Sequence, residues 1–390
     1  MKNVRHSVSS ILIIICLVGF PQISESIFTP SLPALSQALM VSAKTSQLTM
    51  SSYFIAFAIG VVFWGWLSDR FGRRPAMLLG IAVYFLGNIG LLLAPSFGWL
   101  LLFRLAQSFG ASSGSVVTQT IMRESFYGVR ATKVFAAVTA AMALSPALGP
   151  LIGGLLQTYY GYKSVFSFLI IMAVSLLLYA GFRLPETRIS AVQTPMKKGQ
   201  FWTLVKRLLT DKTVWVYAIL ISGINGILFS YYAEAPFIFI DHFKLTPITY
   251  GTLGLALAFA NIFGAITVNR LIMNHTAIAV TRIGLTTAVI GSVLLVGASV
   301  VNQFGWMVLF IFVVFYGLNI TLPMALQLAL VGYGDVIGLA SGLFSFGYYL
   351  LISLLTYLMS ALHTGAITVL PVYILVLVII MLLGHTRIKE

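Results

Sequence analysis

Charged residues and cysteine are both scarce in this chain. Charged residues make up only 8% of the 390 residues, and 9 of them are acidic, whereas hydrophobic residues make up 59%. With a mean hydropathy of +1.00, a soluble domain of this length would expose very large apolar patches. The composition therefore predicts a membrane protein. The single cysteine, Cys16, lies in an apolar run, which excludes an intrachain disulfide and a thiolate metal site.

The sequence also lacks the segments of about 10 residues with alternating polarity that a membrane β-barrel requires. Its apolar runs suit helices, which span a bilayer with about 20 residues and satisfy their own backbone hydrogen bonds. We predict an all-α polytopic membrane protein with twelve transmembrane helices in two pseudo-symmetric six-helix bundles. The predicted spans are residues 9–32, 46–67, 76–94, 98–122, 133–157, 163–182, 213–238, 247–270, 277–299, 305–330, 336–361 and 365–384.

Lysine and arginine are distributed unevenly between the predicted loops. If the N-terminus lies inside, the outer segments hold only Lys44, Lys163 and Lys244, and nearly all other positive charges fall in inner segments. An excess of positive charge in short loops marks the cytoplasmic side. We therefore expect an inner (plasma) membrane protein with both termini in the cytoplasm. This orientation also accounts for the net charge of +14, so we expect no nucleic acid partner.

The longest polar segment runs from Arg183 to Lys212 and follows the sixth predicted span. It divides the chain into an N-terminal bundle at 1–182, a cytoplasmic linker at 183–212 and a C-terminal bundle at 213–390. Within the linker, the spacing of apolar residues in Phe201 to Leu209, with Trp202 among them, fits an amphipathic helix on the inner leaflet. The proline and charge content fits a disordered linker equally well.

Four stretches resemble the signatures of one transporter family. Gly65 to Arg74, with an acid and three arginines between two apolar runs, resembles the loop signature of the major facilitator superfamily. Leu100 to Gly110 resembles its fourth-helix signature, and Ser145 to Gly154 resembles the fifth-helix signature of its exporters. Tyr231 to Phe237 resembles its bicyclomycin and chloramphenicol resistance branch. The resemblance implies a drug:proton antiporter that works by alternating access.

The loop and fifth-helix stretches supply the expected gate residues. Two spans joined by a loop as short as Gly65 to Pro75 must form a hairpin, and the resemblance implies that Asp69 holds the inner gate shut. Closely spaced glycines let the fifth helix approach a neighbouring backbone, and prolines bend it. A plain packing face is the alternative. The expected gate residues are Gly65, Asp69, Arg70, Gly72, Arg73, Gly149, Pro150, Gly153 and Gly154.

Arg104 is the one positive charge placed well inside a predicted span. An arginine centred in hydrocarbon costs on the order of 3 kcal/mol or more, so it must face the interior and have acceptors. Gln107, at i+3, shares its face. We assign Arg104 to proton coupling or substrate contact, a role that the resemblance also implies. The alternative is a side chain that extends to the outer interface.

Glu25 and Glu234 are acids within predicted spans. They occupy related places in the first and seventh helices, since the two halves are expected to be parallel repeats. Each is followed by a proline, Pro30 or Pro236, which frees a backbone carbonyl nearby. A buried acid in such a place can hold a proton at neutral pH, as a proton antiporter needs. The alternative is a permanent pair with Arg104 or hydrogen bonds to tyrosines.

The expected substrate cavity is apolar with few polar anchors, which suits amphipathic molecules. The five histidines are scattered in loops or at helix ends, where we expect them to be solvated. The sequence shows no catalytic set, no clustered metal ligands and no phosphate loop, so we expect no enzyme, no metal and no cofactor besides the coupling proton. The predicted cavity residues are Gln22, Tyr53, Asn225, Tyr231, Tyr232 and Asn319.

These features favour a proton-coupled multidrug efflux transporter that exports small amphipathic compounds such as antibiotics. An exporter dedicated to one metabolite, such as a siderophore, fits the sequence as well. A proton-coupled nutrient importer fits less well because the fifth helix is of the exporter type, and a membrane enzyme or receptor lacks its residues. We expect a monomer whose partners are a small-molecule substrate and the lipid bilayer.

Overall fold

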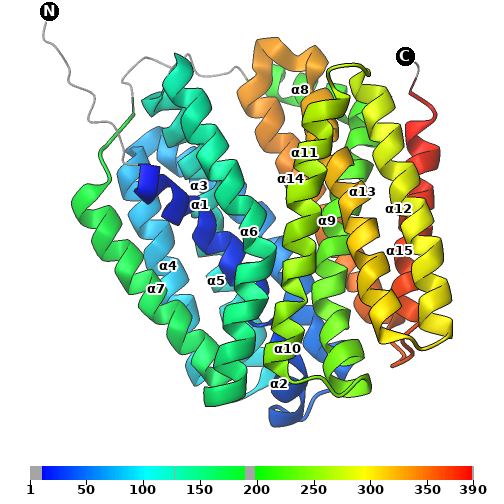
Figure 1. Ribbon diagram of the computed structural model, residues 1–390. Helices are drawn as coiled ribbons and strands as arrows, with labels where there is room; N and C mark the ends of the chain where they lie inside the picture. Colours follow the sequence, from blue (N-terminus) through cyan, green and yellow to red (C-terminus); the bar gives the residue numbers. More distant parts are fainter. Residues whose placement is uncertain (1–10, 127, 189–197, 389–390) are drawn as a thin grey trace, which may run out of the picture.

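The computed structural model describes residues 11–126, 128–188 and 198–388, which contain helices and no strand. The first half contains α1 (Ile11–Ser26), η1 (Thr29–Ser31), α2 (Leu32–Ala38), α3 (Ala43–Phe71), α4 (Arg73–Leu93), α5 (Phe97–Ser125), α6 (Gly128–Tyr160) and α7 (Lys163–Arg183). The rest comprises α8 (Lys198–Thr210), α9 (Lys212–Pro236), η2 (Phe237–His242), α10 (Pro247–Thr252), α11 (Gly254–Leu271), α12 (Ala277–Val300), α13 (Phe304–Leu328), η3 (Val331–Val336), α14 (Ile337–Leu362) and α15 (Val369–His385). Figure 1 shows α2 and α10 at one end of the molecule, and α8 with the C-terminus at the other.

Nine helical segments among the described residues are long and apolar enough to cross a membrane. α6, bent by 41°, is a tenth when its two parts are taken as one span. α5, which holds Arg104 and Gln107, and α15, with 17 residues, complete a bundle of twelve long segments. The prediction of an all-α polytopic membrane protein is confirmed.

Three predicted spans are not single α-helices. The first breaks after Ser26, where the 3₁₀ turn η1 leads into α2. Pro30 has no N–H to bond the Ser26 carbonyl, and the Thr29 hydroxyl donates to that carbonyl instead, at 2.8 Å. The seventh continues beyond Pro236 as the π-helix η2, and the eighth divides at Leu253 into α10 and α11. The predicted spans did not specify these three breaks.

The short loop predicted between the second and third spans is a single residue. α3 continues through Phe71, α4 begins at Arg73, and only Gly72 lies between them. Gly72 has a φ of 109°, and a Cβ atom there would collide with the Glu186 carboxylate. Residues with side chains rarely adopt this backbone conformation, so the α3–α4 hairpin depends on glycine at this position.

The two halves meet through two sets of helices. α3 packs on α14, and α6 packs on α10 and α11; α6 and α11 lie side by side at the centre of Figure 1. A Cβ atom at Gly153 of α6 would collide with the Ile27 carbonyl in the first half, and one at Gly154 would collide with the Pro247 carbonyl in the second. The glycines of α6 thus permit close backbone contacts on both sides of the helix.

Within the predicted linker, residues 198–210 form the helix α8, so the helical alternative holds there. Its buried apolar residues are Leu204 and Leu208, whereas Trp202 is 69% exposed. Contact of the exposed apolar side chains with the inner leaflet stays a prediction. Arg207 attaches α8 to the second half, because its Nη2 donates to Gly332 O at 2.5 Å.

Replacing Gly153 with alanine should destabilise the fold, because the added methyl group would meet a backbone carbonyl that has little room to move. We expect the free energy of unfolding to fall by about 1–3 kcal/mol, seen as a lower midpoint in thermal denaturation of the purified protein. Gly181→Ala is the matched control, since a Cβ atom there meets nothing within 4 Å, and its midpoint should stay level or rise slightly. Equal midpoints for the two variants would contradict the close contact.

Candidate functional site

Arg104 lies on α5 in the interior of the first half and is 2% exposed. Its Nη1 donates to Gln107 Oε1 and, at 3.4 Å, to Ser24 O. Gln107 Nε2 in turn donates to Asn88 Oδ1 at 2.5 Å, and Asn88 Nδ2 donates to Tyr84 O at 2.8 Å. These hydrogen bonds join α1, α4 and α5. Arg104 therefore faces the bundle interior rather than the outer interface.

The Arg104 guanidinium also lies against two aromatic rings. Its Cζ is 4.2 Å from the ring centroid of Phe28 and 4.4 Å from that of Tyr53. Such cation–π contacts partly replace the water that a buried cation has lost. Among the described residues, Arg104 Nε and Nη2 have no hydrogen-bond partner. These two atoms form an edge that matches a carboxylate in a bidentate pair, so Arg104 has unused capacity for an acid.

Glu25 is the acid that could pair with this edge of Arg104. It lies on α1, is 4% exposed and interacts electrostatically with Arg104. Across the part of the chain that the structure describes, the two side chains form no ion pair or hydrogen bond with each other. The alternative of a permanent Glu25–Arg104 pair therefore does not describe this conformation. The hydroxyls of Tyr53 and Tyr84, also buried, have no partner among the described residues either.

Glu234 lies on α9 and is 1% exposed, but its partners are not those of the Arg104 cluster. Gln47 Nε2, on α3, donates to Glu234 Oε2 at 2.5 Å. His363 Nδ1, just after α14, lies 2.8 Å from both carboxylate oxygens of Glu234. Neither Arg104 nor a tyrosine, the alternatives considered above, is hydrogen-bonded to this acid among the described residues.

The expectation of solvated histidines is wrong at two positions. The His363 side chain is 13% exposed and pairs with Glu234. His385 is fully buried at the end of α15, and its Nε2 lies 3.1 Å from Ile278 O. One signal could have indicated the first contact. Glu234 lies near the outer end of the seventh predicted span and His363 directly follows the eleventh, so the two are at the same depth.

The predicted substrate-cavity residues lie in both halves and are buried or half-buried. Asn225 and Asn319 each donate, at 2.8 Å, to the carbonyl four residues earlier in their own helices, which leaves their amide oxygens available. Phe54 on α3 and Phe229 on α9 join the halves nearby, with ring centroids 4.3 Å apart. The full set is Gln22, Tyr53, Asn225, Tyr231, Tyr232 and Asn319.

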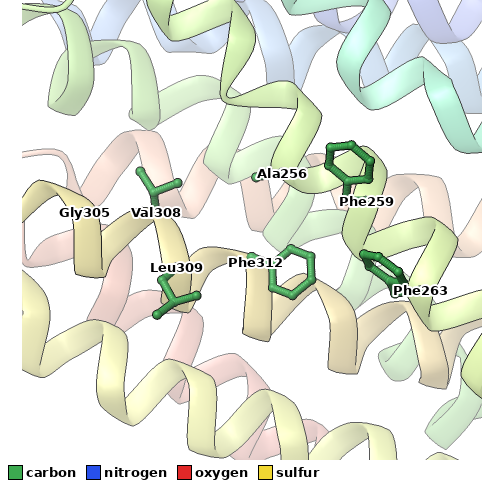
Figure 2. Close-up of a pocket in the computed structure, with 7 residues that line it drawn as sticks. All are labelled: Ala256, Phe259, Phe263, Gly305, Val308, Leu309 and Phe312. Carbon is green, nitrogen blue, oxygen red and sulfur yellow. The ribbon is translucent and has the colours of Figure 1, made fainter.

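A cavity of about 580 Å³ lies at another place, between α11 and α13, and Figure 2 shows the side chains that line it. Phe259 and Phe263 in its wall are about half exposed. An open, apolar hollow on the outside of spanning helices fits contact with lipid acyl chains, so we do not assign substrate to it. The lining residues are Ala256, Phe259, Phe263, Gly305, Val308, Leu309 and Phe312.

Arg73 organises the end of the first half at which α3 meets α4, predicted above to be the inner end, and is 4% exposed. Its Nη1 pairs with Asp69 Oδ1 at 2.5 Å, and its Nη2 pairs with Glu124 Oε1 at 2.7 Å. Glu186 accepts hydrogen bonds from the backbone N–H groups of Arg73 and Arg74 at the N-terminus of α4, at 2.8 and 3.1 Å. Asp69 thus pairs within its own half, and closure of an inner gate against the second half stays a prediction.

The other predicted gate residues are also structural contacts in this conformation. The Arg70 carbonyl accepts from Arg188 Nη1 at 2.8 Å, and a Cβ atom at Gly65 would approach Val116. A Cβ atom at Gly149 would collide with the Ser26 hydroxyl on α1. A Cβ atom at Gly251 of the second half would lie 2.5 Å from the Pro150 carbonyl oxygen, so this part of α6 also contacts α10 closely.

The two halves are in contact at the end that the distribution of positive charge predicts to lie outside, which is called the outer end below. Ser360 Oγ of α14 donates to Lys44 O of α3 at 2.7 Å, and Ser353 Oγ donates to Ser51 O at 2.7 Å. The hydrogen bond from Gln47 to Glu234 crosses between the halves at the same end. The structure therefore represents a conformation in which the outer end is closed.

Sequence comparison identifies the family. The profile of the Major Facilitator Superfamily matches residues 14–357, and the chain belongs to this superfamily. It is 35% identical to an uncharacterized transporter of Rickettsia bellii (strain RML369-C), over 91% of this chain and 90% of the other. It is 29% identical to a chloramphenicol resistance protein of Pseudomonas aeruginosa, over 69% of this chain and 63% of that protein. The chain is thus a multi-pass membrane transporter, and the family resemblance of the four signatures is confirmed.

A solved structure has the same fold. The crystal structure of a D-xylose-proton symporter matches this chain with a TM-score of 0.78, covering 95% of this chain and 96% of the other. The sequence identity is 13%, so the similarity concerns the fold alone.

Arg73→Lys should destabilise the α3–α4 end of the first half, because a lysine cannot pair with Asp69 and Glu124 through the two sides of a planar fork. We expect the free energy of unfolding to fall by about 1–3 kcal/mol, measured by thermal denaturation. Arg74→Lys is the control. It removes a hydrogen bond from Arg74 Nη2 to Gly181 O at an exposed position, where a loss of about 0–1 kcal/mol is expected. A larger loss for the Arg74 variant would argue against the network.

Proposed function

We propose that this protein is a proton-coupled efflux transporter that exports small amphipathic compounds, such as antibiotics, from the cytoplasm. The proposal rests on one observation: Glu25 and the Nε/Nη2 edge of Arg104 are both buried, attract each other and are not yet bonded. The similarity to a chloramphenicol resistance protein supports drug export. The exporter-type signature in α6 supports the outward direction.

Glu25 is the proposed proton carrier. While its carboxyl group holds a proton, the Arg104 edge stays open, as in this conformation. After the proton leaves, the carboxylate can take that edge in a bidentate pair, which compensates a charge that is costly to bury alone. Proton release and pairing therefore occur together. The new pair would draw α1 and α5 closer, which links the protonation state to the shape of the first half.

Transport proceeds by alternating access, in which the two halves move about a substrate site near the bilayer midplane. We propose that the residues predicted from the sequence line an apolar cavity with few polar anchors, which would accept varied amphipathic molecules. Protons are the only coupling ion we propose, without a metal or cofactor. We place the protein in the inner (plasma) membrane as a monomer with both termini in the cytoplasm.

Glu25→Gln should abolish proton release on substrate binding and uphill transport into inverted membrane vesicles with an imposed pH gradient. Glutamine keeps the size of the side chain but carries no exchangeable carboxyl proton. The measurement uses a pH-sensitive dye for proton release and chloramphenicol for uptake. Asp241→Asn, which removes an exposed acid after Pro236, is the control and should retain both activities. Full activity of the Glu25 variant would assign coupling to another group.

The same vesicles distinguish the alternative functions. Uptake of several unrelated antibiotics supports a multidrug exporter, whereas uptake of one siderophore alone supports an exporter of a single metabolite. Movement of substrate toward the cytoplasmic side together with protons would indicate an importer. Transport that continues after an ionophore has collapsed the pH gradient, with no other ion gradient present, contradicts proton coupling.

A further inference from the structure

Glu234, His363 and Gln47 form a buried polar cluster at the outer end of the bundle, outside the Arg104 site. Glu234 and His363 come from α9 and from the end of α14, both in the second half, and their side chains are 1% and 13% exposed. Gln47 comes from α3 in the first half and is fully buried. Its Nε2 donates to Glu234 Oε2 at 2.5 Å and also lies 3.3 Å from His363 Nδ1. The cluster therefore bridges the two halves.

The geometry fits one charge state of the closed cluster, an ionised Glu234 beside a protonated His363. His363 Nδ1 lies 2.8 Å from both Glu234 oxygens, and an ionised carboxylate only accepts hydrogen bonds, so Nδ1 must carry a proton to donate to it. When Glu234 is ionised and His363 is protonated, the acid has an opposite charge beside it and two donors, His363 Nδ1 and Gln47 Nε2. An ionised acid at this depth is stable only with such compensation.

Opening the outer end must break the cluster. α3 and α14 are the helices that close this end, through the bonds from Ser353 and Ser360 to backbone carbonyls of α3. If they separate, Gln47 leaves with α3 and the Glu234 carboxylate loses its donor from the first half. Protonating Glu234 removes the buried charge and weakens both contacts. Deprotonating His363 leaves the acid without its counter-charge, which favours entry of water and separation.

Other charged groups at this end are farther out or exposed. On α3 the one nearest in sequence is Lys44, which is exposed. After α9, the helix η2 and the residues that follow it carry Asp241, His242 and Lys244. His242 Nε2 lies 3.0 Å from Asn302 Oδ1. Phe237 separates them in sequence from Glu234, and its ring lies 5.6 Å from that of His363. Among the described residues, the ion pair at this end that joins two buried side chains is Glu234 with His363.

We propose that Glu234, His363 and Gln47 form an outer latch, which holds the halves closed while Glu234 is ionised and His363 is protonated. Opening to the outside is then coupled to protonation of Glu234, and His363 and Gln47 act as positioning residues for that step. The latch predicts that closure is strongest at intermediate pH and weakens toward both acid and alkaline pH. It does not depend on which compound is transported.

The test measures the distance between the outer ends of the two halves without substrate. Spin labels are attached at Ser96→Cys, in the loop between α4 and α5, and at Thr252→Cys, at the end of α10; both positions are exposed. Cys16, the single native cysteine, is replaced by alanine. Double electron–electron resonance of the protein in lipid nanodiscs then gives the ratio of closed to open populations from acid to alkaline pH.

In the labelled parent, the closed-to-open ratio should be highest at intermediate pH and fall by about tenfold on each side, as expected of a coupled pair in contact. Glu234→Gln and His363→Gln should each lower the ratio and remove both falls, because either change leaves the ion pair incomplete at every pH. The control His242→Gln changes an exposed histidine at the same end and should keep both.

A residue with a merely structural role would change the ratio equally at every pH. A parent ratio that does not vary with pH, or Glu234 and His363 variants that both keep the parent's full profile, would overturn the latch. Each variant decides independently, so poor folding of one leaves the test intact. Because no substrate is present, failure here is distinct from failure of the proton-coupled export tested with Glu25→Gln.

Discussion

The cost of an uncompensated charge in hydrocarbon governs the polar chemistry of this bundle. Arg104 is surrounded by an amide, a backbone carbonyl and two rings, and Glu234 is held by a histidine and an amide. Glu25 is attracted electrostatically to Arg104 but, among the described residues, forms no hydrogen bond or ion pair with it. One cluster is thus complete in the closed outer state, and the other has unused bonding capacity. A change of conformation that completes the second while breaking the first would leave the number of compensated charges nearly constant.

The long helices could be predicted from the sequence because lipid leaves the backbone few other ways to satisfy its polar groups. The positions of the breaks could not. The sequence shows Pro30, which frees the Ser26 carbonyl. The break also depends on the Thr29 hydroxyl, which donates to this carbonyl and lets the chain turn. At Gly72 the loop is shorter than predicted because the charged residues before it remain helical. Asp69, at the end of α3, therefore pairs with Arg73, four residues later at the start of α4.

The candidate site was predictable only where charge stood out against an apolar background. Glu25, Arg104 and Glu234 could be named for that reason, and all three are buried. The partners of Glu234 could not, because they lie 187 and 129 residues away in the sequence. A glutamine in a helix carries no local signal, and for His363 the one signal was that it lies at the same depth of its predicted span as Glu234. Their contacts with Glu234 form only when the fold places the ends of α3, α9 and α14 side by side.

α3 is a single helix of 29 residues, about 44 Å long at the usual rise of 1.5 Å per residue. It carries Gln47 near its outer end and Asp69 near its inner end, and one glycine joins it to α4. Midway along it, the ring of Phe57 rests 4.8 Å from that of Tyr349 on α14, which offers a pivot. If α3 rotates as a rigid body about this contact, one end moves away from the second half while the other end moves toward it. The length of α3 is therefore itself a safeguard against a continuous water path across the membrane.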